Sequence, residues 1–111
     1  KVLDEKAFEI YLAKLRKGIT KAIDTQLQYP RIAQRRKLEG EVVLLLKIDG
    51  QGVLNKASIE QSSGHRVLDE EAMNTVKKAS PFPKPPKELE SRIFNVSVPI
   101  NFSLKNDDGG V

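Results

Sequence analysis

An apolar run followed by a glycine-containing turn sets the strongest limit on how this chain folds. Residues 42–48 are hydrophobic on both faces of a strand, because Val43 and Leu45 fill positions that a half-buried strand leaves polar. This composition predicts a central strand with cover on both sides. Residues 49–52 supply two glycines where a hairpin needs positive φ, so we predict a second strand over 53–60 beside the first. The predicted inward set of that second strand is Val53, Ala57 and Ile59.

Helical periodicity flanks this hairpin on both sides. Residues 4–25 place apolar side chains at the spacing of one helical face, and residues 68–79 repeat such a face over a shorter stretch. Pro30 suits the first turn of a helix, so a short helix is predicted over 30–37. Residues 80–86 hold four prolines and are predicted to form a stiff connector. The predicted apolar faces are Phe8, Leu12, Leu15, Ile19 and Ile23 in the long helix and Leu68, Ala72, Val76 and Ala79 in the last one.

The C-terminal part carries the most regular strand pattern. From residue 94 to residue 104 every second side chain is apolar, as in a strand with one buried face. The predicted order of helix, short helix, strand, strand, helix and strand makes an α+β fold, a two-layer domain with a three-stranded antiparallel sheet packed against helices. If the last strand pairs antiparallel with the first, the sheet order is 2-1-3, and residues 42–48 lie in its centre.

Pro99 interrupts the last strand and indicates an edge position, because proline cannot donate a hydrogen bond to a sheet. Backbone groups of alternate residues point to the same side of a strand. If the nitrogen of Pro99 faces the open edge, the backbone groups of four neighbours face it too, namely those of Asn95, Ser97, Asn101 and Ser103. No lysine lies between Ile93 and Leu104, so this edge can accept an added strand. The chain's own tail, a second copy of the chain or water could also fill it.

Composition excludes several classes of protein. The net charge of +4, from 19 basic and 15 acidic residues, is too balanced to indicate nucleic-acid binding, and no aromatic residues interleave with the basic ones. The absence of cysteine excludes disulfides and thiolate metal sites and leaves the compartment open. No run approaches the roughly 18 apolar residues that a spanning helix needs. Because the sequence begins at Lys1, we expect a fragment whose membrane anchor, if any, lies upstream.

The residues that could do chemistry form no recognisable catalytic or metal site. His65 is the only histidine and follows Gly64 in a predicted turn, so it is interpreted as a solvated loop residue. Asp69 is adjacent to two glutamates, but consecutive helical positions point in different directions, and helix-end electrostatics account for all three acids. We therefore expect no catalytic residue, no metal and no cofactor, and predict that the chain is not an enzyme.

A local basic cluster precedes the first strand. It consists of Arg31, Arg35, Arg36 and Lys37. The cluster is either a solvated helix face or an electrostatic patch that meets an acidic partner, where it would steer encounter more than it adds affinity.

Six short motifs in register resemble the C-terminal domain of the TonB family, over residues 26 to 104. They are Gln26-x-Gln28-Tyr29-Pro30, Leu38-Glu39-Gly40, Asp49-Gly50-x-Gly52, Ser62-Ser63-Gly64, Leu68-Asp69 and Pro81-Phe82-Pro83. The resemblance implies a periplasmic domain of an inner-membrane-anchored energy transducer that works with ExbB and ExbD. Such a domain binds the TonB box of outer-membrane transporters by adding it to the edge of the last strand. It transmits energy derived from the proton-motive force for the uptake of siderophores, metals and nutrients.

The resemblance also implies which residues meet the partner. These are Gln26, Gln28, Tyr29 and Pro30, together with Asn95, Ser97, Pro99, Asn101 and Ser103 on the last strand. Pro99 departs from an uninterrupted docking edge, and a long N-terminal helix is not uniform in the family. We expect residues 1–25 to form an N-terminal helix leading from an absent spacer, 26–104 to form the family domain, and 105–111 to be a frayed tail. The alternatives are a TolA-like envelope adaptor and a module that oligomerises by strand pairing.

Overall fold

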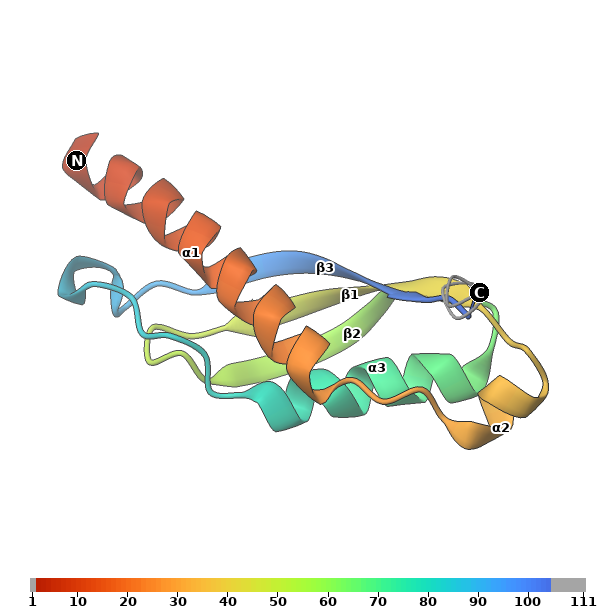
Figure 1. Cartoon of the computed structure of the whole chain (residues 1–111). Helices are drawn as coiled ribbons and strands as arrows, with labels where there is room; N and C mark the ends of the chain where they lie inside the picture. The colour runs from red at the N-terminus through yellow and green to blue at the C-terminus, as the bar shows by residue number, and fades with distance from the viewer. Residues whose placement is uncertain (1, 105–111) are drawn as a thin grey trace, which may run out of the picture.

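The computed structural model describes residues 2–104 and shows an α+β fold (Figure 1). Its elements are α1 (Val2–Gln26), α2 (Arg31–Arg35), β1 (Gly40–Ile48), β2 (Leu54–Gln61), α3 (Arg66–Ala79), the 3-10 helix η1 (Lys87–Leu89) and β3 (Phe94–Phe102). The order of helices and strands predicted from the sequence is confirmed, with boundaries that differ by a few residues. The tail predicted to be frayed, 105–111, lies outside the described residues.

The three strands form one antiparallel sheet in the order β2-β1-β3, as predicted. β1 and β3 pair along nine residues without a register shift, from Gly40 opposite Phe102 to Ile48 opposite Phe94. The pairing of β1 with β2 shifts register at two places, between Val43 and Leu44 and again before Ile48. β1 is therefore central, and β2 and β3 form the two edges.

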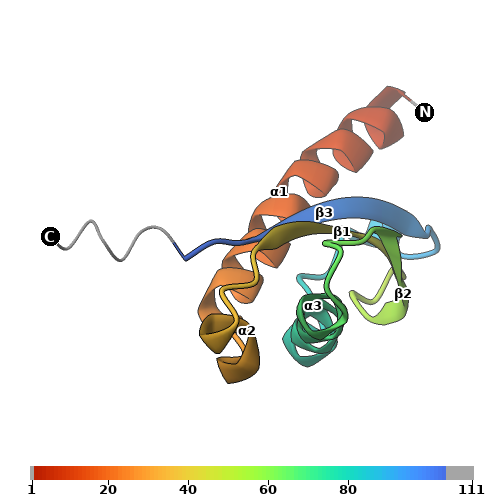
Figure 2. The same cartoon turned by 90° about the vertical axis from the view of Figure 1, so that its right-hand side faces the viewer.

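One face of the sheet is covered by α1 and α3, which lie on the same side of it (Figure 2). The buried side chains of this layer are Val42, Leu44, Leu46 and Ile48 of β1, Phe94, Val96, Val98, Ile100 and Phe102 of β3, Tyr11, Leu15, Ile19 and Ile23 of α1, and Leu68, Ala72 and Val76 of α3. Tyr11 belongs to the core although the sequence pattern did not mark it, whereas Phe8 and Leu12 are only partly buried. The N-terminal end of α1 projects past the sheet (Figure 1), and Glu5 and Lys6 near that end are exposed.

The outer face of the sheet has no cover among the described residues, so the prediction that β1 is covered on both sides is wrong. Leu45, in the middle of the central strand, is 37% exposed, and Val43 is half-buried. The prediction of a second covering layer relied on the hydrophobicity of Val43 and Leu45. In the structure both side chains stand on the solvent-facing side of the sheet. They leave aliphatic side chains accessible beside the exposed Lys47.

The predicted inward set of the second strand is also only partly correct. Ala57 is half-buried, but Ile59 is 43% exposed, and Val53 lies exposed outside the strand. β2 is an edge strand, so its outer flank has no neighbouring strand to cover these side chains.

The turn between β1 and β2 uses its two glycines for different reasons. Gly52 adopts φ +84°, the conformation that favours glycine. Gly50 has no positive φ, which corrects the expectation that both glycines serve this need. A Cβ at Gly50 would lie 1.8 Å from the carbonyl oxygen of Glu90, so this glycine permits a close approach of two backbones.

The proline-rich connector 80–86 contains no helix or strand and is fastened to the fold at several points. The Phe82 N–H donates to the Gly52 carbonyl oxygen at 2.7 Å, and the Tyr11 hydroxyl donates to the Pro83 carbonyl oxygen at 2.6 Å. The buried ring of Phe82 adds an apolar anchor. None of the helices in the described part of the chain is long and apolar enough to cross a membrane.

Candidate functional site: the free edge of β3

β3 pairs only with β1 among the described residues, so its second edge carries no strand. Pro99 lies opposite Val43, and the register is unbroken on both sides of it. The backbone of β3 thus offers a regular, nine-residue edge with no paired strand among the described residues. Such an edge is a template for an added strand.

The side chains predicted to flank a docked strand lie on the outer face of the sheet. Asn95, Pro99 and Asn101 are exposed, and Ser97 is half-buried. The Ser97 hydroxyl donates a hydrogen bond to Oε1 of Glu60 at 2.9 Å, which crosses the outer face from β3 to β2. Ser103 lies exposed just beyond the end of β3. The structure therefore places Asn95, Ser97, Pro99 and Asn101 at alternate positions of β3, whereas the strand ends before Ser103 and does not reach residue 104 as predicted.

Aromatic rings hold both ends of β3 in place. At its start, Phe94 contacts Phe8 at 5.3 Å and Tyr11 at 4.8 Å between ring centroids, so α1 supports this end. At its other end, Phe102 meets the ring of Tyr29 edge-on at 5.4 Å. Paired aromatic rings contribute about 0.5–1.5 kcal/mol beyond the area that they bury. Both ends of the edge are thereby anchored to the rest of the fold.

Tyr29, in the segment between α1 and α2, contacts the C-terminal end of β3 through the ring of Phe102. The Tyr29 hydroxyl donates a hydrogen bond to the carbonyl oxygen of Leu38, which fixes the ring between α2 and the sheet. Burial and then the negative charge of Glu39 raise the pKa of Tyr29 above its ordinary value, so the hydroxyl stays protonated and keeps donating. Gln26 and Gln28 are exposed, and Pro30 is half-buried directly before α2.

The predicted basic cluster lies on and directly after α2. Arg31 and Arg35 lie in α2, and Arg36 and Lys37 follow it; all four are exposed. Of these four, only Arg36 borders a hollow between α2 and the start of α3.

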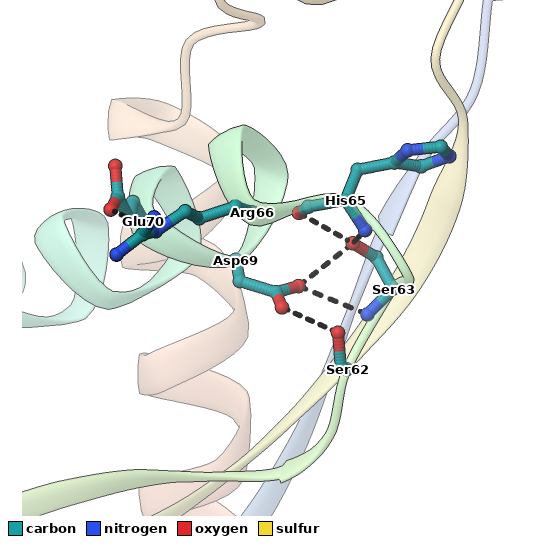
Figure 3. A network of polar contacts seen from close by, with 6 residues as sticks. All are labelled: Ser62, Ser63, His65, Arg66, Asp69 and Glu70. Carbon is teal, nitrogen blue, oxygen red and sulfur yellow. Dashed lines mark hydrogen bonds and ion pairs between the residues drawn. The ribbon is translucent and has the colours of Figure 1, made fainter.

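Sequence reasoning missed a polar network around Asp69 (Figure 3). This buried carboxylate accepts hydrogen bonds from the Ser62 hydroxyl at 2.5 Å, the Ser63 hydroxyl at 2.7 Å and the Ser63 N–H at 2.9 Å. Burial alone would raise the pKa of Asp69, but these hydrogen bonds and the nearby His65 lower it below its ordinary value.

The network corrects two expectations. Asp69 does not act only on the helix end, because it fastens α3 to the end of β2 through the two serines. His65 stands directly before α3 and is half-buried rather than fully solvated. The signal in the sequence was the pair of serines seven and six residues before the aspartate, which the adjacent Glu70 and Glu71 obscured. In the described part of the chain, no group of three or more histidine, cysteine or acidic residues could hold a metal ion.

This small α+β domain, with its free strand edge, is similar in sequence and fold to known proteins. The family described as Gram-negative bacterial TonB protein C-terminal matches residues 25–104. The TonB protein of Helicobacter pylori is 32% identical over 90 residues, covering 80% of this chain and 30% of that protein. The TonB protein of Vibrio cholerae is 37% identical over 82 residues, covering 72% of this chain and 32% of that protein.

Solved structures agree with this result. The solution structure of the Helicobacter pylori TonB C-terminal domain aligns with a TM-score of 0.73 at 31% identity and covers 83% of this chain and 82% of that one. The structure of TolAIII aligns at 0.63 and 19% identity, over 82% of this chain and 75% of that one, which shows a shared fold alone. The chain belongs to the TonB C-terminal domain family, as the six motifs indicated. It spans about a third of the length of the curated relatives it matches.

Proposed function

We propose that this domain binds an extended segment of an outer-membrane transporter, the TonB box, by adding it as a fourth strand to the free edge of β3. The observation that carries the proposal is a regular, nine-residue edge that continues through a proline. Because Pro99 has no N–H to donate, an unbroken register is expected when its nitrogen faces away from β1. The N–H groups of Ser97 and Asn101, two residues away on either side, then face the same open edge.

Backbone pairing gives this mode of binding its strength and its tolerance of sequence. About five residues of added strand form roughly five hydrogen bonds, each contributing about 0.5–1.5 kcal/mol net. The cost of ordering the peptide offsets much of this gain, so we expect micromolar affinity. Side chains play a smaller part in strand addition, which allows one domain to serve several transporters. Tyr29 contacts Phe102 at the C-terminal end of β3, so we propose that the stretch formed by Gln26, Gln28, Tyr29 and Pro30 meets the segment where it leaves or enters.

The wider role follows from the family. We infer that the domain works in the periplasm as the distal part of an inner-membrane-anchored transducer, with ExbB and ExbD acting on the part outside this sequence. It would transmit energy from the proton-motive force for the uptake of siderophores, metals or other nutrients. No catalytic step, cofactor or nucleic acid enters this role. Self-association through the same edge is a competing use of β3, and sedimentation of the domain with and without peptide separates the two.

A second candidate function has one observation in its favour. The TolAIII structure, which shares the fold, was solved with a bound peptide derived from the N-terminus of TolB. An envelope adaptor of this kind would also use peptide capture, so the fold does not separate the two. The family match over residues 25–104 supports the TonB-type role.

A matched pair of variants tests edge docking. Ser97→Pro removes one outward N–H. We expect it to weaken binding of a TonB-box peptide about tenfold, because the added strand loses one hydrogen bond and the proline ring disturbs its local fit. Ser97→Ala removes the hydroxyl contact with Glu60 and keeps the N–H, so it should bind like the unchanged domain. Amide spectra establish that both variants are folded. Equal affinity of a folded Ser97→Pro variant, confirmed by equal affinity of Asn101→Pro, would rule out docking in this register.

A further inference from the structure

A hollow of about 420 Å³ lies between α2 and the start of α3, apart from the edge of β3. Its α2 side is lined by Ile32, Arg36 and Leu38, and its α3 side by Gly64, His65, Arg66, Val67 and Glu70. This volume falls within the range of roughly 300–1,000 Å³ typical of ligand pockets. The hollow is thus large enough to receive side chains of a partner.

Three of the residues that line the hollow are aliphatic, and we call them its floor: Ile32, Leu38 and Val67. Ile32 is a large apolar side chain that is 46% exposed on the surface of α2. Leu38 and Val67 are partly buried against the core. A large aliphatic side chain that stays accessible inside a concave surface gains from being covered by another apolar group. The floor therefore suits an aliphatic side chain.

The rim of the hollow is basic. Arg36 and Arg66 stand on opposite sides of it, and Arg66 Nε lies 3.3 Å from Oε2 of Glu70. That contact is the only ion pair among the residues the structure describes, so Arg36 has no carboxylate partner there. Arg31, Arg35 and Lys37 add positive charge nearby on and after α2. A guanidinium group matches the geometry of a carboxylate.

The wall at Gly64 is open. A Cβ built at Gly64 would meet no atom within 4 Å, so the chain of a partner can approach this stretch of backbone without displacing a side chain.

We propose that this hollow binds an acidic segment of a protein partner, with an aliphatic side chain on the floor and a flanking carboxylate on Arg36. Charge complementarity decides the occupant, because the hollow is lined by two guanidinium groups, the imidazole of His65 and a single carboxylate, Glu70, which already contacts Arg66. A purely apolar segment would leave Arg36 without a partner, and a basic one would be repelled. The site is a second contact, independent of strand addition at β3.

A minimal probe tests the chemistry directly. Acetyl-Glu-Leu-Glu-amide is titrated into the ¹⁵N-labelled domain, with acetyl-Lys-Leu-Lys-amide and inorganic phosphate as comparisons. We expect the acidic peptide to shift the amides of Gly64, Arg66 and Val67, and the other two probes to leave them unmoved. Equal shifts with the lysine peptide or with phosphate alone would overturn the proposal, the latter in favour of a small-anion site.

Two charge-matched variants localise the binding. Arg36→Glu should weaken the acidic peptide about tenfold, whereas Arg31→Glu, the same change at the first residue of α2 and outside the hollow, should change it less than about twofold. Ile32→Ser should weaken it as well, which separates the aliphatic floor from bulk charge. Equal losses in Arg36→Glu and Arg31→Glu would overturn the assignment. Ser97→Pro should not affect this titration, so failure here is distinguishable from failure of docking at β3.

Discussion

The hydroxyl of Ser62 donates a 2.5 Å hydrogen bond to Oδ2 of Asp69, which joins the loop after β2 to the first turn of α3. Ser63 donates two more hydrogen bonds to the other carboxylate oxygen of Asp69, at 2.9 and 2.7 Å. A carboxylate that accepts several hydrogen bonds is strongly stabilised in its charged form. The free energy of unfolding is therefore expected to depend on the protonation of Asp69.

We predict that the stability supplied by Asp69 is lost in acid. Because the folded-state pKa is lowered, this stability is fully present above the unfolded-state pKa of about 3.9 and disappears as the pH falls through the folded-state value. Asp69→Asn should lower the free energy of unfolding by about 1–3 kcal/mol at pH 7. Urea unfolding from pH 7 to pH 2 measures the difference between the two proteins. A difference that stays constant over that range would contradict the assignment.

A second prediction concerns the close approach of the turn to η1. Gly50→Ala would place a Cβ 1.8 Å from the Glu90 carbonyl oxygen, so one of the two backbones must move. We expect a loss of about 1–3 kcal/mol in the free energy of unfolding. Gln51→Ala, at the exposed neighbouring position, should change it by less than about 0.5 kcal/mol. If thermal and urea unfolding give equal effects for both variants, the close approach does not exist in solution.

A third prediction tests whether α1 is part of the folded unit. Ile19 is fully buried against the sheet, whereas Ile10, on the same helix, is 56% exposed. Ile19→Ala should lower the free energy of unfolding by about 2–5 kcal/mol. Ile10→Ala should leave it within about 0.5 kcal/mol, because that residue buries little surface. Matching small effects from both substitutions would mean that α1 does not pack on the sheet.

The order of elements could be predicted because periodicity reports it locally. The alternation from 94 to 104 and the helical spacing in 4–25 fixed the type of each segment, and Pro99 marked β3 as an edge. The exposure of Leu45 could not be predicted from the same rules. Hydrophobicity shows which side chains gain from burial, but whether a second layer covers them depends on the rest of the fold.

The features that the sequence did not reveal depend on residues far apart in the chain. Gly50 is needed because of the backbone at Glu90, forty residues later, and Tyr11 is held by the Pro83 carbonyl on the connector. Asp69 was assigned to helix-end electrostatics because the serines that bind it lie in a different element. The hollow at Arg36 likewise forms only when α2 and α3 come together.

The central claim is that the free edge of β3 captures an extended segment of an outer-membrane transporter. Titration of the ¹⁵N-labelled domain with a TonB-box peptide tests it most directly. The account predicts micromolar binding, with amide shifts concentrated in residues 95–103 and around Tyr29, and with smaller changes along β2, the opposite edge. Shifts confined to β2 or to the outer face around Leu45, or no shifts at millimolar peptide, would contradict it.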